Sequence, residues 1–312
     1  MAGGMDWIAT DWIAMDWIAI DWGTSRLRVW AMDRSGAVLT HAASDRGMGT
    51  LAPEEFEGAL LELIAPWLTD RPTPALICGM AGAREGWREA GYRDAPCAPV
   101  SGGGLTRVPT SDPRLDAYIV PGLRQMDPPD VMRGEETQLA GLLRADPGFD
   151  GVVCLPGTHS KWVEIRGGAV IRFQTFLTGE LFDLLAARSI LRHTVGGDGW
   201  NDAAFVDAAR EAVASPGQAI AHLFGLRAGY LLHGLGAAAA RARLSGLLIG
   251  AELGAARSYW NGHVAHLVGA GPLVTSYADA LEAAGCATMR HDAQTLTLAG
   301  LFQARLSLED LT

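Results

Sequence analysis

Residues Leu155 to Trp162 read Leu-Pro-Gly-Thr-His-Ser-Lys-Trp, a glycine turn that carries two hydroxyls, an imidazole and an amine. Lys161 is the only lysine of a chain with 25 lysines and arginines in total. Lysine offers a flexible point charge with three donors, and freed backbone N–H groups and hydroxyls of such turns bind phosphate. An arginine-rich composition that kept one lysine by chance is the alternative. We expect phosphate or another anion to be bound by Gly157, Thr158, His159, Ser160 and Lys161.

A second glycine-hydroxyl turn, Asp21-Trp22-Gly23-Thr24-Ser25, lies near the start of the chain. Alone it would read as an ordinary Asx-type turn. Two such turns facing each other across a cleft could grip a polyphosphate, with Gly23, Thr24 and Ser25 as donors. The Asp21 carboxylate could hold Mg²⁺ directly or through water.

Each turn stands in the same local pattern. A short apolar run, the turn, an alternating strand, a second turn and a further short strand occur at residues 18–39 and again at residues 152–171. Internal similarity of this kind predicts two lobes of like topology. Asp146-Pro147-Gly148 reads as a linker, so the lobes are expected at residues 15–148 and 149–312.

Helical and apolar patterns alternate around these units. Residues 53–68 form a helical pattern with one apolar face, Phe56, Leu60, Ile64 and Trp67, followed by an apolar strand at residues 75–78. Leu247-Leu248-Ile249 and His266-Leu267-Val268 are each predicted as a strand before a helix. The expected fold class is therefore α/β, with a mixed sheet flanked by helices in each lobe.

The composition excludes several classes of protein. A chain of 312 residues with 49% hydrophobic content is globular, and its net charge of −10 argues against a nucleic-acid binder. The four cysteines form no CxxC pair, so neither a metal nor a disulfide framework is expected. No apolar run reaches the length of a membrane span, and we expect a cytoplasmic protein, with a homodimer as one possible state. Residues 1–14 carry two copies of an Asp-Trp-Ile-Ala repeat and are expected to form a mobile extension.

Beyond the two turns, three further segments complete a recognisable set of motifs: Cys78 to Trp87, Val131 to Gln138, and Leu177-Thr178-Gly179-Glu180-Leu181-Phe182. In this order they resemble the 2-dehydro-3-deoxygalactonokinases, a sugar-kinase branch of the actin-like ATPase superfamily. The resemblance covers residues 15 to about 182. It implies two actin-like (ribonuclease H-like) lobes with a cleft between them, which close over the substrates. It also implies transfer of the ATP γ-phosphoryl group, with Mg²⁺, to the 6-hydroxyl of 2-dehydro-3-deoxy-D-galactonate.

The resemblance also assigns roles to residues. It places Asp21 at the metal and the two turns at the phosphates, although Pro156 stands where the superfamily has an aspartate. Gly134-Glu135-Glu136 resembles the helix start where related kinases carry their base, so Glu135 is the expected base and Glu136 its rival. Acidic residues are also favoured in a first helical turn by the helix dipole alone.

The remaining assignments concern the two substrates. A sugar-acid carboxylate suits a bidentate arginine, and the candidates are Arg26, Arg84 and Arg133, with Gly79, Met80 and Gly82 as a small-residue loop for close ligand approach. Adenosine is expected at Gly269, Ala270 and Gly271, with Gly250 either beside them or in a plain turn. Two alternatives stay open: a kinase of another sugar acid or deoxy sugar, and a nucleotide-binding regulator or filament module without transfer activity.

Overall fold

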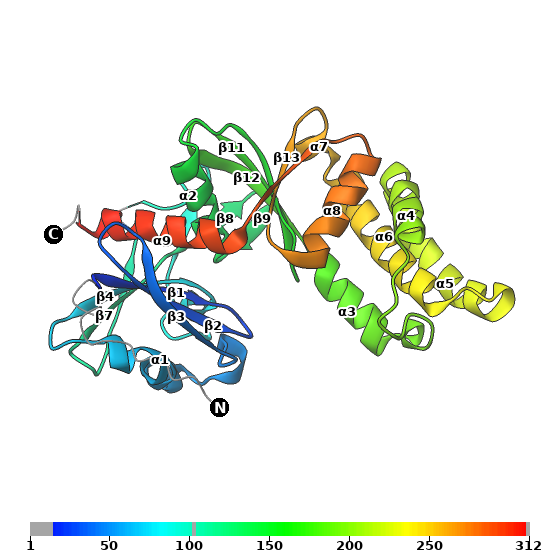
Figure 1. Cartoon of the computed structure of the whole chain (residues 1–312). Helices are drawn as coiled ribbons and strands as arrows, with labels where there is room; N and C mark the ends of the chain where they lie inside the picture. The colour runs from blue at the N-terminus through cyan, green and yellow to red at the C-terminus, as the bar shows by residue number, and fades with distance from the viewer. Residues whose placement is uncertain (1–14, 102–103, 310–312) are drawn as a thin grey trace. The chain divides into compact units, whose positions relative to one another are not determined.

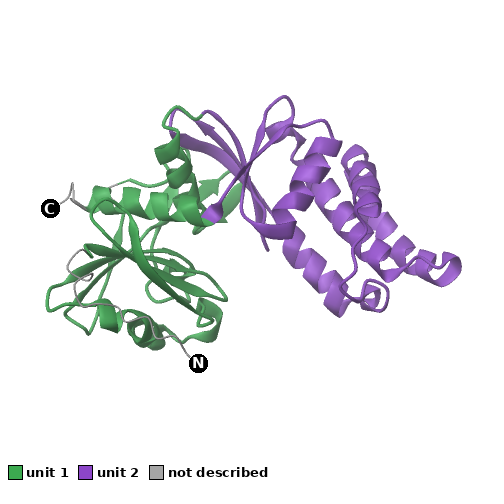
Figure 2. Ribbon diagram, viewed as in Figure 1, with its two compact units in different colours: residues 1–149, 294–312 green, residues 150–293 purple. Residues whose placement is uncertain are grey.

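The structure, a computed structural model, describes residues 15–101 and 104–309 (Figure 1). The expected extension at residues 1–14 lies outside the described residues. The chain divides into two compact units (Figure 2). Unit 1 comprises Met1–Phe149 with Gln294–Thr312, and unit 2 comprises Asp150–Ala293.

Unit 1 is built on a six-stranded sheet in the order β3-β2-β1-β4-β7-β6. The strands are β1 Trp17–Trp22, β2 Leu27–Met32, β3 Val38–Ser44, β4 Thr73–Gly79, β6 Thr106–Val108 and β7 Leu115–Ile119. The first three are successive antiparallel hairpins, and β4 runs parallel to β1 and to β7. Strand β1 therefore lies inside the sheet, which matches its apolar sequence.

Alternate side chains of β1 serve two cores. Ile18, Ile20 and Trp22 pack with Phe56, Leu60 and Ile64 of helix α1, Phe56–Ile64. Trp17 and Ala19 point the other way, toward Leu301 and Ala304 of helix α9, Ala293–Glu309. Figure 1 shows α1 and α9 on opposite faces of this sheet. The apolar face of residues 53–68 is confirmed.

Helix α9 corrects the predicted division of the chain. The sequence placed all of residues 149–312 in the second lobe, but Gln294–Thr312 belongs to unit 1. The cause is the second apolar face of β1, which α9 covers, with the Phe302 ring stacked 6.2 Å from that of Trp17.

Unit 1 also contains a three-stranded sheet and helix α2. The small sheet has the order β5-β8-β9. These elements are β5 Tyr92–Asp94, β8 Gly122–Met126, β9 Pro129–Met132 and α2 Glu135–Ala145. Strand β9 leads directly into α2, so Arg133 and Gly134 lie between a sheet and a helix start.

Unit 2 repeats the topology of unit 1. Its sheet has the order β12-β11-β10-β13-β14, with antiparallel hairpins β10 to β12 followed by parallel β13 and β14. The strands are β10 Gly151–Leu155, β11 Ser160–Arg166, β12 Ala169–Phe176, β13 Ala265–Val268 and β14 Thr288–His291. The predicted repeat of a three-strand unit is confirmed, as is the mixed sheet flanked by helices.

Six helices belong to unit 2, and one of them overturns a strand prediction. They are α3 Thr178–Arg188, α4 Asp202–Ala214, α5 Ala219–His233, α6 Ala237–Ala255, α7 Arg257–Trp260 and α8 Gly271–Ala283. Leu247-Leu248-Ile249 was predicted as a strand but lies within α6. A three-residue apolar run fits a buried helix as well as a strand, and α6 is buried among its neighbours. Within the described residues, no helix is long and apolar enough to cross a membrane.

Candidate functional site

In unit 1, the turn at Gly23, Thr24 and Ser25 that is predicted to bind phosphate, here called the first phosphate turn, joins β1 to β2. The Gly23 N–H donates to Arg26 O at 2.9 Å, which closes the turn. From a neighbouring loop, Met48 N–H and Gly49 N–H donate to Gly23 O and Thr24 O at 3.0 and 2.9 Å. Thr24 and Ser25 are exposed at the tip. The turn is thus braced from one side and open on the other, as a phosphate cradle requires.

Asp21 lies at the end of β1, opposite Arg28 of β2 and beside Cys78 of β4. Its Oδ2 accepts a hydrogen bond from Arg28. Burial raises the pKa of Asp21, and Arg28 acts in the opposite direction. The arginine therefore helps to keep an inward-facing carboxylate in its charged form.

Two glycines bring the start of α2 against this strand end. Gly79 has φ 89°, and a Cβ there would lie 2.6 Å from Trp22 O. Gly134 has φ 102°, and a Cβ there would lie 3.3 Å from Gly79 Cα. Both angles are in the region that favours glycine. The close approach gathers the ends of β1 and β4 and the N-terminus of α2 into one site.

The two glutamates at the α2 N-terminus differ in their surroundings. Glu136 is 0% exposed; its Oε2 accepts from Gly134 N–H at 2.7 Å and its Oε1 from Thr137 Oγ1 at 3.0 Å. Burial, with a contribution from the Glu135 charge, raises the pKa of Glu136 to about 8. Glu135 is only half-buried, and its Oε2 accepts from Arg133 N–H at 3.0 Å. Of the two, Glu135 is the one a substrate hydroxyl could reach.

The three candidate arginines are placed very differently. Arg26 and Arg84 have 77% and 81% of their side chains exposed and form long ion pairs with Asp45 and Glu89. These exposed pairs contribute little. Arg133 instead reaches beneath the loop that follows β4, where its Nη2 donates to Ala90 O at 2.6 Å.

The Arg133 guanidinium is buried without an anionic partner. Its Nε and Nη1 have no hydrogen-bond acceptor, and no carboxylate of the described chain forms an ion pair with it. The Tyr92 ring lies 4.5 Å from Arg133 Cζ, and a Cβ at Gly82 would be 2.6 Å from Nη1. Met80–Gly82 forms a 3₁₀ turn directly over this charge. An anion at that loop would relieve the cost of the unpaired cation.

In unit 2, the second phosphate turn joins β10 to β11 and is backed by the start of α3. A Cβ at Gly179 would lie 2.4 Å from Gly157 O, so only glycine allows this contact. Glu180 N–H donates to Thr158 O at 2.9 Å, and Glu180 Oε2 is 2.6 Å from His159 Nε2. A helix N-terminus beside a glycine turn favours bound anions. The sequence contained Thr178 and Gly179 in a recognised motif but assigned them no role.

The residues after the turn face in alternate directions. Ser160 and Trp162 both donate to Glu252 of α6, at 2.6 and 2.9 Å. Lys161 points to the other face of the sheet and is 5% exposed. Ser160 is 0% exposed, and its single hydroxyl proton is used by Glu252. The Ser160 hydroxyl therefore holds the turn from behind, and the predicted phosphate contact of this residue remains a prediction for its backbone N–H.

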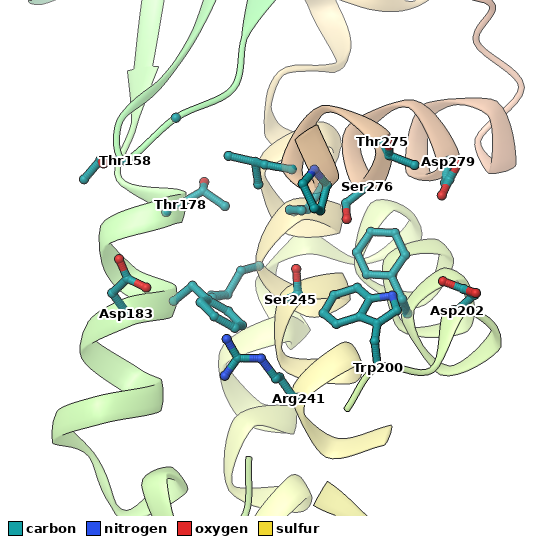
Figure 3. Close-up of a pocket in the computed structure, with 18 of the residues that line it drawn as sticks. Thr158, Thr178, Asp183, Trp200, Asp202, Arg241, Ser245, Thr275, Ser276 and Asp279 are labelled. Atoms are coloured by element: carbon teal, nitrogen blue, oxygen red, sulfur yellow. The ribbon is translucent and has the colours of Figure 1, made fainter. Parts of the chain in front are cut away.

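A pocket of 880 Å³ opens beside this turn (Figure 3). Gly157, Thr158, Thr178 and Gly179 line one side, and Figure 3 shows Thr275, Ser276 and Asp279 of α8 on another. Other walls come from α3, α6, the start of α4 and the segment before it, with Phe182, Asp183, Arg241, Ser245, Leu248, Ile249, Asp198, Trp200 and Asp202. The volume is in the range of small-molecule and cofactor sites. None of the wall residues beyond the turn was predicted, because they come from separate segments without a shared spacing.

Two aromatic groups give the pocket its apolar walls. The Phe182 ring has Arg241 Cζ 5.0 Å from its centre, and the Trp200 ring lies 5.5 Å from that of Phe205. Arg241 and Ser245 of α6 also line the pocket and are labelled in Figure 3. Flat apolar walls with a few polar groups suit a nucleobase, and the glycine turn at one side suits its phosphates.

The predicted adenosine residues divide into two groups. Gly269, Ala270 and Gly271 line a smaller hollow of 280 Å³ at the start of α8, and Thr275 lines both hollows. Gly250 was predicted to lie beside the adenosine or in a plain turn, but it lies inside α6 and lines neither hollow. A Cβ at Gly250 would lie 2.4 Å from Ala209 O, so this glycine serves the packing of α6 on α4.

Among the residues that the structure describes, no group of three or more acidic, histidine or cysteine side chains could enclose a metal ion. A dedicated protein cage for a metal is therefore not a feature of the described chain. Mg²⁺ commonly uses only one or two carboxylates and takes its other ligands from water and substrate phosphates. The inward-facing Asp21 at the first phosphate turn fits that kind of site.

Comparisons with known proteins agree over nearly the whole chain. A family model described as 2-keto-3-deoxy-galactonokinase matches residues 21–304. "Probable 2-dehydro-3-deoxygalactonokinase DgoK1" of Rhizobium meliloti (strain 1021) is 45% identical over 290 residues, 90% of this chain and 94% of that protein. The 2-dehydro-3-deoxygalactonokinase of Escherichia coli (strain K12) is 34% identical over 272 residues, 85% of this chain and 88% of that protein. A solved structure, "Crystal structure of a putative 2-dehydro-3-deoxygalactonokinase protein from Sinorhizobium meliloti", has 44% identity and a TM-score of 0.88, covering 94% of this chain and 99% of that chain.

Proposed function

Because this chain belongs to the 2-keto-3-deoxy-galactonokinase family, we propose that it phosphorylates 2-dehydro-3-deoxy-D-galactonate at the 6-hydroxyl with ATP. The family makes the protein a carbohydrate kinase of galactonate catabolism with an actin-like, sugar-kinase fold. The expected family, fold class and enzyme class are thus confirmed. The acceptor position and the roles of individual residues are our proposals.

The observation that carries the nucleotide proposal is the 880 Å³ pocket beside Gly157 and Thr158. Its aromatic walls would hold the base, and the turn with the α3 N-terminus would hold phosphates. The first turn, at Gly23, Thr24 and Ser25, would contact the phosphates as well. His159 and Lys161 remain candidates for phosphate contacts on the second turn, and Gly269 to Gly271 for contacts with adenosine.

Asp21 would hold Mg²⁺ through its carboxylate or through bound water. Bound there, the ion would neutralise negative charge on the phosphates during transfer. The hydrogen bond from Arg28 orients the Asp21 side chain before any ion arrives. Because Arg28 donates to Oδ2, Oδ1 is the Asp21 oxygen that would bind the ion or its water.

Glu135 would act as the base, since Glu136 is sealed from solvent and its pKa is raised to about 8. The proton of the 6-hydroxyl passes to Glu135 as the oxygen bonds to the γ-phosphorus. The bond from that phosphorus to the bridging oxygen breaks, and ADP leaves. Such transfer depends chiefly on positioning and charge stabilisation.

The substrate carboxylate would lie at the Gly79–Gly82 loop, with Arg133 as its counter-charge. Support comes from the two buried Arg133 nitrogens without an acceptor. An unpaired buried cation is costly, so an anion at this loop is favoured over a neutral sugar. Arg26 and Arg84 are less suitable because both are exposed and already paired.

The exposed face of α5 supports a homodimer. Ile220, Phe224, Leu231 and Leu232 are large apolar side chains on this surface, 60–79% exposed. Monomers rarely expose contiguous apolar patches larger than a few hundred Å². Arg227 is the one side chain on α5 with a permanent charge, so the same face of a second copy could pack on it without strong like-charge repulsion. We place the protein in the cytoplasm, where ATP is supplied.

The test is ATP turnover with Mg²⁺ on 2-dehydro-3-deoxygalactonate, its gluconate epimer, galactonate and water. Glu135→Gln is compared with the parent and with Glu54→Gln, an exposed glutamate of the same unit. We expect rapid turnover on the first compound and a loss of about 10²-fold or more in Glu135→Gln alone. Faster turnover on another acid would favour the alternative acceptor. ATP binding without turnover on any acceptor would favour the non-catalytic module.

A further inference from the structure

Glu252 is a buried carboxylate at which four side-chain donors meet. It lies in α6 and is 3% exposed. Ser160 Oγ and Tyr277 OH donate to its Oε2 at 2.6 Å each, and Trp162 Nε1 donates to its Oε1 at 2.9 Å. Thr178 Oγ1 also donates to Oε2. The donors come from β11, α3 and α8, so one side chain joins four elements.

A carboxylate in such a place is costly unless its oxygens are satisfied. Burial raises the pKa of Glu252, and the four hydrogen bonds act against that shift. The indole N–H of Trp162 can only donate, and the three hydroxyl oxygens are at hydrogen-bond distance from the same carboxyl group. An ionised carboxylate accepts hydrogen bonds and has no proton to donate, so four donors around Glu252 suit this form. The network therefore stabilises the ionised form of Glu252 against the cost of its burial.

Two of the donors lie at the edges of the second phosphate turn. Ser160 is the first residue of β11, directly after the turn, and Thr178 is the first residue of α3. The next residue of α3, Gly179, contacts Gly157 of the turn, where a Cβ would lie 2.4 Å from Gly157 O. Glu252 thus fixes both the exit of the turn and the helix end against which the turn packs.

The hydrogen bonds also decide which groups of the turn stay available. Each hydroxyl has one proton, and those of Ser160 and Thr178 point to Glu252. Thr158 lines the pocket, and no hydrogen bond to Glu252 involves it. The turn therefore lines the pocket with Gly157 and Thr158, and the hydroxyls of Ser160 and Thr178 hold it from behind.

We propose that Glu252 is a positioning residue for ATP, which holds the Gly157–Ser160 turn and the start of α3 in the geometry that receives the phosphates. The inference rests on the proposed function, because it assigns the pocket beside this turn to the nucleotide. Glu252 itself does not contact the nucleotide. Loss of its charge should therefore weaken ATP binding through the turn and leave the affinity for the sugar acid unchanged.

The decisive variant is Glu252→Gln, which keeps the size of the side chain. Its amide has one acceptor oxygen and one donor nitrogen, so whichever way it turns, the nitrogen faces either the Trp162 indole N–H or the hydroxyls of Ser160, Thr178 and Tyr277 and removes an acceptor from them. We expect the Kd for Mg·ATP, measured by titration calorimetry, to rise at least tenfold. In turnover, KM for ATP should rise by a similar factor while KM for the sugar acid stays within twofold.

Leu253→Ala is the matched control, since Leu253 is the next residue of α6 and is 0% exposed. Its side chain makes no hydrogen bond with the turn. This variant should unfold at a lower temperature than the parent yet bind ATP with parental affinity. If Glu252 has only a structural role, Glu252→Gln should likewise unfold at a lower temperature and bind ATP with parental affinity. That result would overturn the proposal.

Thr178→Val supplies a second, independent measurement. If Glu252 acts through the Thr178 hydroxyl, both changes remove the same interaction. The double variant Glu252→Gln/Thr178→Val should then bind ATP only slightly more weakly than Glu252→Gln alone. Fully additive losses would contradict the proposed route. Failure of the proposed function looks different: the parent protein itself would then either not bind Mg·ATP or bind it without turnover on any acceptor.

Discussion

Replacing Gly179 with alanine should impair ATP use while leaving the protein folded. The added Cβ would lie 2.4 Å from Gly157 O and 2.8 Å from Thr158 Cα. Ordinary contact begins at 3.4 Å, so the turn and α3 must separate by roughly 1 Å. A misplacement of about that size can cost on the order of 10²-fold in rate. We expect kcat/KM for ATP to fall by about that factor.

The fold should tolerate this change, because alanine favours a helix by about 0.8–1.0 kcal/mol relative to glycine. That gain offsets part of the clash in the first turn of α3. Gly58→Ala is the matched control, since Gly58 lies in α1 and a Cβ there would meet nothing within 4 Å. It should raise the free energy of unfolding slightly and leave turnover unchanged.

The assay measures initial rates against ATP at saturating sugar acid, together with thermal unfolding of both variants. We expect a large loss of kcat/KM for ATP in Gly179→Ala and none in Gly58→Ala. A folded Gly179→Ala protein with parental kcat/KM for ATP would refute this expectation. In that case the turn either moves freely or takes no part in binding the nucleotide.

Two further predictions concern stability and assembly. Burial raises the pKa of Glu136 from 4.5 to about 8 in the folded protein. The contribution of this group to the free energy of unfolding is therefore complete below pH 4.5. It is lost as pH rises toward 8, by up to about 1.4 kcal/mol per pH unit. Glu136→Gln should flatten this slope in urea unfolding at pH 5 to 8, and an unchanged slope would contradict the assignment. Phe224→Glu on α5 should convert a dimer to a monomer in light scattering with turnover retained; a parent that is already monomeric would refute the proposed interface.

The sequence identifies the parts of the site that are local. Both phosphate turns, the Gly134-Glu135-Glu136 helix start and the Gly79–Gly82 loop occur where short motifs placed them. Their conformations are confirmed because a glycine turn between alternating strands is specified within about ten residues, and their roles in binding and catalysis stay predictions. The repeated three-strand unit follows for the same reason.

Features that depend on distant packing were not predicted. Helix α6 is apolar on most of its surface, so Leu247-Leu248-Ile249 gives no periodic signal that separates helix from strand. Gly250 in the same helix was predicted to contact adenosine or to form a plain turn. It instead allows the close packing of α6 on α4, because a Cβ there would lie 2.4 Å from Ala209 O. Likewise, α9 follows unit 2 in sequence but covers Trp17 in unit 1.

Ser160 shows most clearly why a motif alone does not define a role. Its position after a glycine turn predicts a phosphate donor, and strand alternation then directs it away from Lys161 and toward the helices. Its acceptor, Glu252, is 92 residues away in sequence, and no local pattern links the two. A hydroxyl has one proton, so the acceptor that receives it decides whether the residue binds a ligand or shapes the site that does.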